Sequence, residues 1–253
     1  MARVIALANQ KGGVGKTTTA INLGASLAKM GSSTLLIDVD PQGNATSGIG
    51  LTKQNIETCI YNSLIDDTPL KEIILNTDWE NLEVAPATIQ LAGAEIELVS
   101  VVSREEKLKK AILPVINEYD FIIIDCPPSL GLLTLNALNA AHGVMIPIQC
   151  EYYALEGLGQ LMNTINIVRK HLNESLNIEG VVLTMYDTRT NLSEQVAEEV
   201  RGYFKHYVYN TVIPRNVRLS EAPSYGKHIL EYDPRSKGAS LHLALAREVL
   251  KNE

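Results

Sequence analysis

Short apolar segments alternate with longer amphipathic segments along most of the chain. Residues 121–124 and 180–183 are apolar throughout, which is typical of strands covered on both faces of a sheet. The pattern predicts strands at residues 3–8, 34–38, 82–85, 121–125, 143–148, 178–184 and 210–213. It predicts helices at residues 16–30, 56–66, 91–99, 103–118, 131–140, 154–172, 192–206 and 238–251. This alternation indicates a doubly wound α/β fold, in which helices cover both faces of a mostly parallel sheet.

Nothing in the pattern divides the chain into separate units. Its 253 residues contain no repeat, low-complexity tract or linker, and open α/β sheets often reach this length. We therefore expect one domain over residues 1–253. Pro114 falls inside the expected helix at 103–118 and should kink or shorten it.

A glycine-rich segment, KGGVGKTTTA at residues 11–20, follows the first expected strand and opens the first expected helix. This is the context that a phosphate-binding loop requires, because the backbone N–H groups and the helix N-terminus then point at phosphate oxygens. Lys16 can reach the β- and γ-phosphates, and the Thr17 hydroxyl can bind Mg²⁺. We expect the chain to bind a nucleoside triphosphate. The expected nucleotide contacts are Lys11, Gly12, Gly13, Val14, Gly15, Lys16, Thr17 and Thr18.

Lys11 distinguishes this loop from an ordinary phosphate loop, which has a glycine near its start and a single lysine. A lysine at the start of the loop points away from the γ-phosphate of its own nucleotide. We therefore expect Lys11 to reach the nucleotide of a neighbouring subunit. The alternative is a solvated lysine on a loop.

Acidic residues follow two further expected strands. Alternation along the strand places Asp38 and Asp40 on the same side, where a carboxylate can orient a metal-bound or attacking water. The Pro-Gln-Gly sequence after Asp40 indicates a mobile loop that could respond to the γ-phosphate. Asp125 ends the apolar strand 121–125 and is expected to hold Mg²⁺; the alternative is a cap for the next helix. The expected Mg²⁺ contacts, partly through water, are thus Thr17, Asp38 and Asp125, and the expected catalytic residues are Lys11, Lys16 and Asp40.

Composition indicates the class of protein and the compartment in which it works. Hydrophobic residues make up 45% and charged residues 20% of the chain, which is typical of a globular protein. No apolar run approaches the roughly 18 residues that span a bilayer, and the expected strand at residue 3 leaves no room for a signal peptide. The three cysteines have no paired or metal-binding spacing, and the five histidines have no ligand spacing. We expect a cytoplasmic protein with reduced thiols.

The net charge of −7 is distributed unevenly. Residues 201–220 contain four basic residues and no carboxylate, and a local basic surface can bind DNA on an acidic protein. The alternative is an ordinary solvated helix face and loop. We expect DNA contacts from Arg189, Arg201, Lys205 and Arg218, with Arg201 and Lys205 on one helix face. Arg215 has an alternative place in the nucleotide pocket.

The pattern K-G-G-x-G-K-[ST] resembles the deviant Walker A ATPases, the family of ParA, MinD and the nitrogenase iron protein. Five further segments resemble chromosomal ParA proteins of the Soj type, and together they cover nearly the whole chain. They are DVDPQGNATSGIG at 38–50, APATIQLAGAEIE at 85–97, IDCPPSLGLLTLNAL at 124–138, IQCEYYALEGL at 148–158 and VIPRNVRLSEAPSY at 212–225.

The resemblance implies an ATPase with ATP and Mg²⁺ as cofactors. By it, Lys11 crosses the interface of an ATP-sandwich homodimer, Asp40 is required for hydrolysis, and Pro214 and Asn216 contact the adenine. Relatives of this type bind double-stranded DNA non-specifically as ATP dimers, a ParB-type centromere-binding protein stimulates their hydrolysis, and the switch serves chromosome or plasmid segregation. The N-terminal helix-turn-helix region of some plasmid ParA proteins is not expected, and the protein should associate with the nucleoid.

Three alternatives remain. A MinD-like ATPase that positions itself on a membrane requires a C-terminal amphipathic helix with a basic face, whereas Arg247 and Lys251 stand beside Glu248 and Glu253. A reductase requires cluster-binding cysteines, whereas Cys126 and Cys150 are expected to be core thiols. A small-molecule kinase or synthetase is compatible with the fold alone.

Overall fold

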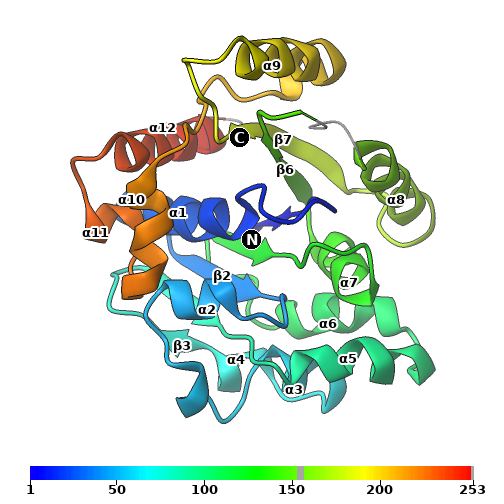
Figure 1. Cartoon of the computed structure of the whole chain (residues 1–253). Helices are drawn as coiled ribbons and strands as arrows, with labels where there is room; N and C mark the ends of the chain where they lie inside the picture. The colour runs from blue at the N-terminus through cyan, green and yellow to red at the C-terminus, as the bar shows by residue number, and fades with distance from the viewer. Residues whose placement is uncertain (153–156, 252–253) are drawn as a thin grey trace.

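The computed structural model describes residues 1–152 and 157–251, and a seven-stranded sheet forms its centre (Figure 1). The strands are β1 (Arg3–Leu7), β2 (Thr34–Asp38), β3 (Leu75–Asn76), β4 (Leu82–Ala85), β5 (Phe121–Asp125), β6 (Gly143–Gln149) and β7 (Asn177–Thr184). Their order is β3-β4-β2-β5-β1-β6-β7, and only β3 and β4 pair antiparallel. The expected α/β fold is confirmed.

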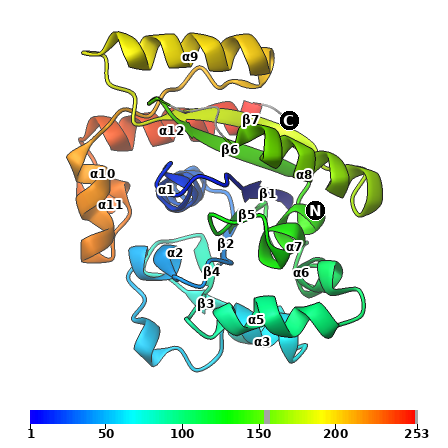
Figure 2. The same cartoon turned by 45° about the vertical axis from the view of Figure 1, so that its right-hand side comes forward.

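The helices cover both faces of this sheet (Figures 1 and 2). They are α1 (Lys16–Lys29), α2 (Asn44–Gly48), α3 (Ile60–Ile65), α4 (Leu70–Ile73), α5 (Leu91–Glu97), α6 (Lys107–Ile112), α7 (Leu132–Ala140), α8 (Leu158–His171), α9 (Asn191–Phe204), α10 (Val217–Glu221), α11 (Ile229–Tyr232) and α12 (Lys237–Lys251). Short 3₁₀ turns are η1 (Lys53–Asn55), η2 (Leu98–Ser100), η3 (Arg104–Glu106), η4 (Lys205–Tyr207) and η5 (Ala222–Tyr225).

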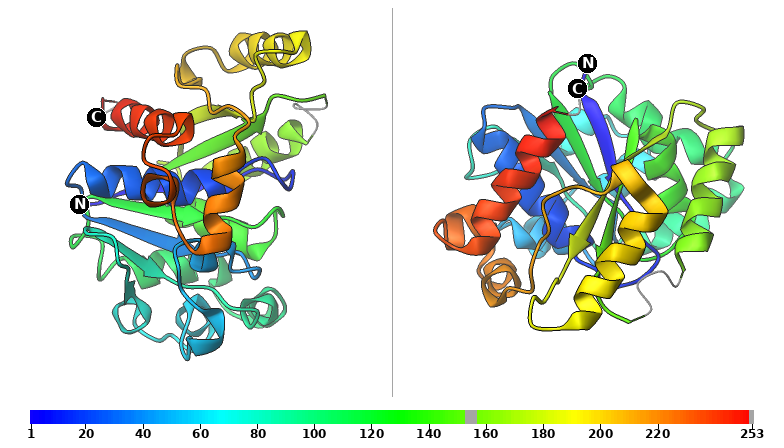
Figure 3. Two further views of the ribbon diagram at one scale, coloured as in Figure 1. Left: turned by 60° about the vertical axis from the view of Figure 1, so that its left-hand side comes forward. Right: turned by 90° about the horizontal axis from the view of Figure 1, so that it is seen from above.

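Alternation along β1 separates two apolar cores. Ile5 and Leu7 pack with α1, α11 and α12 on one face (Figure 3), whereas Val4 and Ala6 belong to the core beneath α3 and α5–α8 on the other. Because both faces are buried, nearly every position of the central strands is apolar. Polar side chains are left to the ends of the strands, where the candidate site lies.

The expected strand at residues 210–213 does not form. The N–H groups of Asn210 and Thr211 each donate to the Glu248 carboxylate over 2.8 Å instead of joining a ladder. The region still runs beside β7, because the N–H groups of Tyr209 and Ile213 donate to the carbonyls of Val181 and Leu183 over 3.0 and 2.8 Å, but the pairing amounts to isolated bridges at Val181–Val208 and Tyr186–Pro214 and not to a ladder. A side chain of α12 thus takes the donors that a strand would need.

The long helices form close to their expected positions, but their ends differ. α6 ends at Ile112, two residues before Pro114, so the proline shortens the helix as expected. α3 begins only at Ile60. The part of the expected helix at 154–156 lies outside the described residues, and α8 begins at Leu158. The short elements α2, α4, α10, α11 and β3 were not predicted.

Candidate nucleotide-binding site

The glycine-rich loop joins β1 to α1 at the carboxyl edge of the sheet. Gly13 and Gly15 have φ angles of 74° and 85°, a region that favours glycine. Gly15 is the N-cap of α1, and no side chain within the described part of the chain caps that helix. Its first N–H groups can therefore bind an anion. The Thr184 hydroxyl at the end of β7 holds the loop by donating to the Val14 carbonyl over 2.8 Å.

The two lysines of the loop occupy different environments. Lys16 is only 6% exposed, and its Nζ donates to the Lys11 carbonyl over 3.3 Å. Burial lowers the pKa of Lys16, while the charges of Asp125, Cys126 and Asp40 oppose this shift. Lys11 is half-buried at the start of the loop. Lys16 is therefore the lysine directed into the site.

Asp125 provides a carboxylate that fits a magnesium ligand. It ends β5, in register with Leu7 of β1 and Asp38 of β2. Both its oxygens are buried, and neither makes a hydrogen bond of good geometry with a residue that the structure describes. Burial and then the charge of Asp38 raise the pKa of Asp125, whereas the Thr17 side chain and the positive charge of Lys16 lower it. A cation bound here would satisfy this carboxylate, and the Thr17 side chain in the first turn of α1 lies within reach of it.

Asp38 and Asp40 lie close together, but their carboxylates accept different hydrogen bonds. The fully buried Asp38 carboxylate accepts from the Asp40 N–H over 3.1 Å and from the N–H and hydroxyl of Thr46, each over 2.8 Å. Burial raises the pKa of Asp38 to about 6, although these hydrogen bonds oppose the shift. Asp40 Oδ1 accepts only the Gln42 N–H, over 2.9 Å, among the described residues. Asp38 thus anchors the loop that carries Asp40, and its predicted contact with Mg²⁺ stays a prediction.

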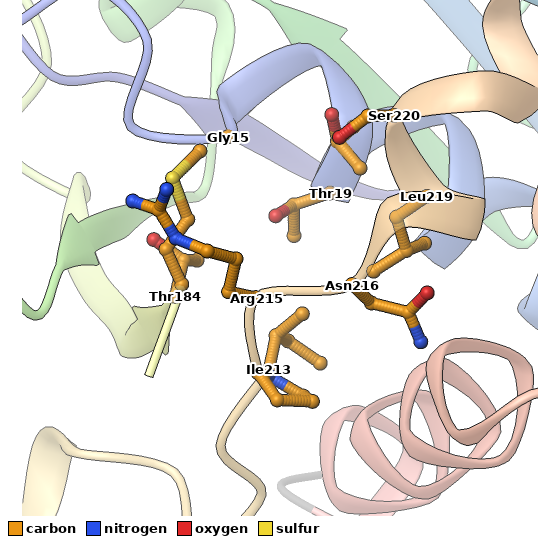
Figure 4. Close-up of a pocket in the computed structure, with 11 residues that line it drawn as sticks. Gly15, Thr19, Thr184, Ile213, Arg215, Asn216, Leu219 and Ser220 are labelled. Atoms are coloured by element: carbon orange, nitrogen blue, oxygen red, sulfur yellow. The ribbon is translucent and has the colours of Figure 1, made fainter. Parts of the chain in front are cut away.

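A cavity of about 260 Å³ lies beside the phosphate loop, between α1, the end of β7 and the loop before α10. Pro214 and Asn216, the residues predicted to contact the base, both line it. Figure 4 shows the Arg215 side chain turned toward Gly15 and the Asn216 amide turned away from it. Asn216 Oδ1 accepts the Arg218 N–H over 2.8 Å and so begins α10. The cavity thus adjoins the phosphate loop, and the contact of Pro214 and Asn216 with the base stays a prediction.

Comparison with known proteins agrees with this geometry. A family model described as an AAA domain matches residues 2–178. The sporulation initiation inhibitor protein Soj of Bacillus subtilis (strain 168) is 64% identical over 252 residues, covering 100% of both chains. The chromosome partitioning protein ParA of Myxococcus xanthus is 58% identical, over 99% of this chain and 89% of that protein. The chain belongs to the Soj/ParA family.

One similar solved structure contains a bound nucleotide and magnesium. The cobyrinic acid a,c-diamide synthase from Mycobacterium smegmatis with bound ADP and magnesium has a TM-score of 0.89 and 38% sequence identity, over 100% of this chain and 95% of that one. Relatives in the Soj/ParA family are named ATPases. The chain is therefore an ATPase whose cofactors are ATP and Mg²⁺.

The four residues predicted to bind DNA are spread along the surface of this Soj/ParA-family chain. Arg189 lies just before α9, whereas Arg201 lies in its last turn, about 15 Å farther along the helix axis. Lys205 has a positive φ of 53° and leaves the helix, so the expected helix face shared with Arg201 is not formed. Arg218 lies on α10. The structure does not gather these residues into one cluster, and their role stays a prediction.

Several pocket residues were missed because no local motif marks them. Thr184 ends β7 and Met185 follows it, and Ile213 and Leu219 flank the loop that carries Pro214 and Asn216. The sequence offers one indication of this pocket, which is the position of Thr184 at the carboxyl end of a parallel strand, where ligands bind in this class of fold. Arg215 lines the cavity, in line with its alternative assignment.

The expected core thiols and terminal helix are confirmed. Cys126 and Cys150 are buried, and burial raises the pKa of both thiols. α12 packs against α1 and buries His242, Leu245 and Val249. Among the described residues, none of the helices combines the length and apolarity needed to cross a bilayer.

Proposed function

We propose that this Soj/ParA-family ATPase is a DNA-partitioning switch. ATP binding forms a sandwich homodimer that binds double-stranded DNA without sequence preference, and hydrolysis dissolves it. A ParB-type centromere-binding protein stimulates hydrolysis, and the cycle serves segregation of a chromosome or plasmid. Family membership, with 64% identity to Soj over the full length, is the observation that carries this proposal.

The contact between the two loop lysines supports a switch. The Lys16 ammonium group donates to the Lys11 carbonyl over 3.3 Å. A γ-phosphate is a stronger acceptor than a neutral carbonyl, so triphosphate binding draws Lys16 away from Lys11. Lys11 is then free to adopt the conformation in which it meets the partner subunit's nucleotide.

The carboxylates divide the work of the catalytic step. Asp125 holds the magnesium ion, which supplies charge neutralisation at the β- and γ-phosphates when bound. Asp40 is 7% exposed and stands on the loop that Asp38 anchors. Its Oδ2 can orient the attacking water, because the Gln42 N–H engages only Oδ1. Loss of the γ-phosphate then leaves the Asp40 loop and Lys16 without their shared contact.

DNA mobility shift with ATP, ADP or no nucleotide tests this function directly. Retardation of several unrelated duplexes with ATP alone is expected, together with an ATP-dependent dimer in sedimentation. The ParB-type protein of the same organism should raise the rate of phosphate release. Equal DNA binding in all three nucleotide states would contradict the switch.

The similarity to the cobyrinic acid a,c-diamide synthase defines a second candidate, a metabolic ligase or synthase. Higher identity over the full length favours the partitioning function, since 64% with Soj exceeds 38% with the synthase. An ATPase rate that rises with DNA and the ParB-type protein supports partitioning. A rate that responds to neither favours the metabolic candidate.

A further inference from the structure

Two glycines from distant parts of the sequence touch through their backbones. Gly50 lies two residues after α2, and Gly226 is the C-cap of η5. A Cβ added to Gly226 would lie 2.7 Å from the Gly50 Cα, and one added to Gly50 would lie 3.0 Å from the Gly226 carbonyl oxygen. The φ angles of 97° at Gly50 and 65° at Gly226 lie in the region that favours glycine. No side chain separates the two segments here, and we call this contact the glycine joint.

One side of the joint belongs to the segment that carries Asp40. The Gly43 N–H donates to the Asp40 carbonyl over 2.8 Å. The Gly50 N–H donates to the Ser47 carbonyl over 3.1 Å. Between these turns lies α2, in which Thr46 is bonded to the buried carboxylate at the end of β2. Hydrogen-bonded turns thus connect Asp40 to the joint, so a displacement of the Asp40 loop reaches Gly50.

The other side of the joint belongs to the segment that carries Arg218. α10 continues into η5 without a gap, and Gly226 ends η5 by donating its N–H to the Pro223 carbonyl over 3.0 Å. Leu219 of α10 lines the cavity beside the phosphate loop (Figure 4). Arg218 is one of the residues proposed to bind DNA. The joint therefore connects the Asp40 loop to a helix that adjoins the nucleotide cavity and the proposed DNA surface.

The elements around the joint are packed closely. α2 contacts η5, and a Cβ added to Gly48 would lie 3.6 Å from the Pro223 Cβ and 2.6 Å from the Ile21 Cδ1 of α1. α1 also holds the segment that follows the joint, because the Asn22 Oδ1 accepts the Ile229 N–H over 2.7 Å. Closely packed interiors have low compressibility and transmit strain. A displacement at Gly50 is therefore passed to η5 and α10.

We propose that the glycine joint transmits the presence of the γ-phosphate from the Asp40 loop to α10, and this inference rests on the proposed function. With ATP bound, the Asp40 loop holds α10 in the position in which Arg218 meets DNA. After hydrolysis the loop moves, the joint moves with it, and Arg218 leaves that position. Neither glycine is among the described residues that line the cavity beside the phosphate loop. The joint is thus a regulatory contact.

Gly226→Ala tests the joint, with Gly31→Ala as the matched control. Gly31 also has a positive φ, of 91°, but a Cβ added there would meet no other described atom within 4 Å. The control therefore carries the backbone strain without the contact. Both variants should bind ATP and form the ATP dimer like the parent. The ratio of the DNA affinity with ATP to that with ADP should fall at least about ten-fold in Gly226→Ala and stay unchanged in Gly31→Ala.

Hydrogen exchange measures the transmission without DNA. In the parent and in Gly31→Ala, the amides of residues 217–227 should exchange at least about three-fold more slowly with a non-hydrolysable ATP analogue than with ADP. Both nucleotides have the same base, so the difference arises from the γ-phosphate. In Gly226→Ala, residues 40–48 should keep this difference and residues 217–227 should lose it. Gly50→Ala, whose added Cβ also meets the joint, provides the same test if Gly226→Ala does not fold.

The contrary results are distinguishable. A nucleotide difference that persists at residues 217–227 in Gly226→Ala would overturn the joint, because the signal would then reach α10 by another route. A fall of the affinity ratio in Gly31→Ala as large as that in Gly226→Ala would overturn it as well, by assigning the effect to backbone strain. Equal DNA binding by the parent with ATP and ADP would contradict the proposed function, whereas hydrogen exchange would still decide whether the joint transmits.

Discussion

Thr46 donates both its backbone N–H and its hydroxyl to the same oxygen of the Asp38 carboxylate, each over 2.8 Å. The hydroxyl oxygen also accepts the Ala87 N–H over 2.9 Å. Both side chains are fully buried, so these bonds are made where water cannot replace them. One threonine therefore joins the end of β2, the Asp40 loop and the segment before α5.

Thr46→Val should destabilise the chain by about 2 kcal/mol, because it leaves the buried Ala87 N–H unpaired and removes one hydrogen bond to the Asp38 carboxylate. Thr46→Ser retains the hydroxyl and should lose less than half as much. The free energy of unfolding in urea, measured without nucleotide, gives both values. A loss in Thr46→Ser as large as that in Thr46→Val would contradict this prediction, because serine keeps the hydroxyl and lacks only the methyl group.

Two buried histidines should make stability depend on pH. Burial lowers the pKa of His228 and of His242 to about 4, below the ordinary value of about 6.5. The unfolded chain then binds more protons, so their stabilising contribution is complete above pH 6.5 and is lost as pH falls toward 4. At pH 5 the loss is about 2 kcal/mol for each histidine.

His242→Leu isolates this effect, because the carboxylates are common to parent and variant. The difference in unfolding free energy between parent and variant should change by about 2 kcal/mol between pH 7.5 and pH 5. His206→Leu is the control, since His206 is exposed. A pH-independent difference for His242→Leu would show that this histidine is not buried in its neutral form.

The sequence was sufficient for the features that local pattern encodes. Continuous apolar runs located six of the seven strands, and the glycine-rich segment located the loop between β1 and α1. Asp125 was predicted because a strand end in this fold faces the ligand edge. Its side chain is buried at that edge, and its contact with Mg²⁺ stays a prediction.

Features that depend on distant partners could not be predicted. Residues 210–213 have strand-like composition, but Glu248 takes the N–H groups of Asn210 and Thr211 from another element. Lys205 stands four residues after Arg201, yet a positive φ ends the helix between them. The contact of Glu95 with Gly131 joins α5 to the loop before α7, and no spacing in the sequence signals it.

Lys11→Ala and Lys16→Ala should separate two functions of one loop. Lys16 is buried and directed into the site, so Lys16→Ala should weaken ATP binding itself. Lys11→Ala should retain ATP binding but lose the ATP-dependent dimer and hydrolysis. Calorimetry with ATP and sedimentation with ATP distinguish these results. An ATP dimer of normal strength in Lys11→Ala would refute a role across the interface.

Asp40→Ala should stop hydrolysis while ATP binding continues, because the remaining contacts of the Asp40 loop run through Asp38 and Thr46. The variant should accumulate an ATP-bound dimer that stays on DNA without turnover. Single-turnover phosphate release and mobility shift after long incubation measure this. If calorimetry instead shows that Asp40→Ala no longer binds ATP, the residue holds the loop or the metal.

Arg189→Ala and Arg218→Ala should weaken DNA binding and leave ATP dimerisation unchanged. In the free chain, Arg189 pairs with Asp187 over 2.7 Å and Arg218 with Glu221 over 2.9 Å. Both pairs are largely exposed, and such pairs contribute little, so DNA phosphates can replace these carboxylates. Each lost phosphate contact should reduce the slope of log K against log salt by about 0.9.

Lys71→Ala is the matched control for these arginines, because Lys71 is an exposed, ion-paired base on α4, at the opposite end of the molecule from α9 (Figure 1). It should bind DNA like the parent. Affinities at about 50 and about 200 mM salt, on two unrelated duplexes, separate phosphate contacts from base contacts. If Arg189→Ala and Arg218→Ala bind DNA like Lys71→Ala at both concentrations, the DNA surface lies elsewhere. A loss confined to one duplex would instead mean that these arginines contact bases.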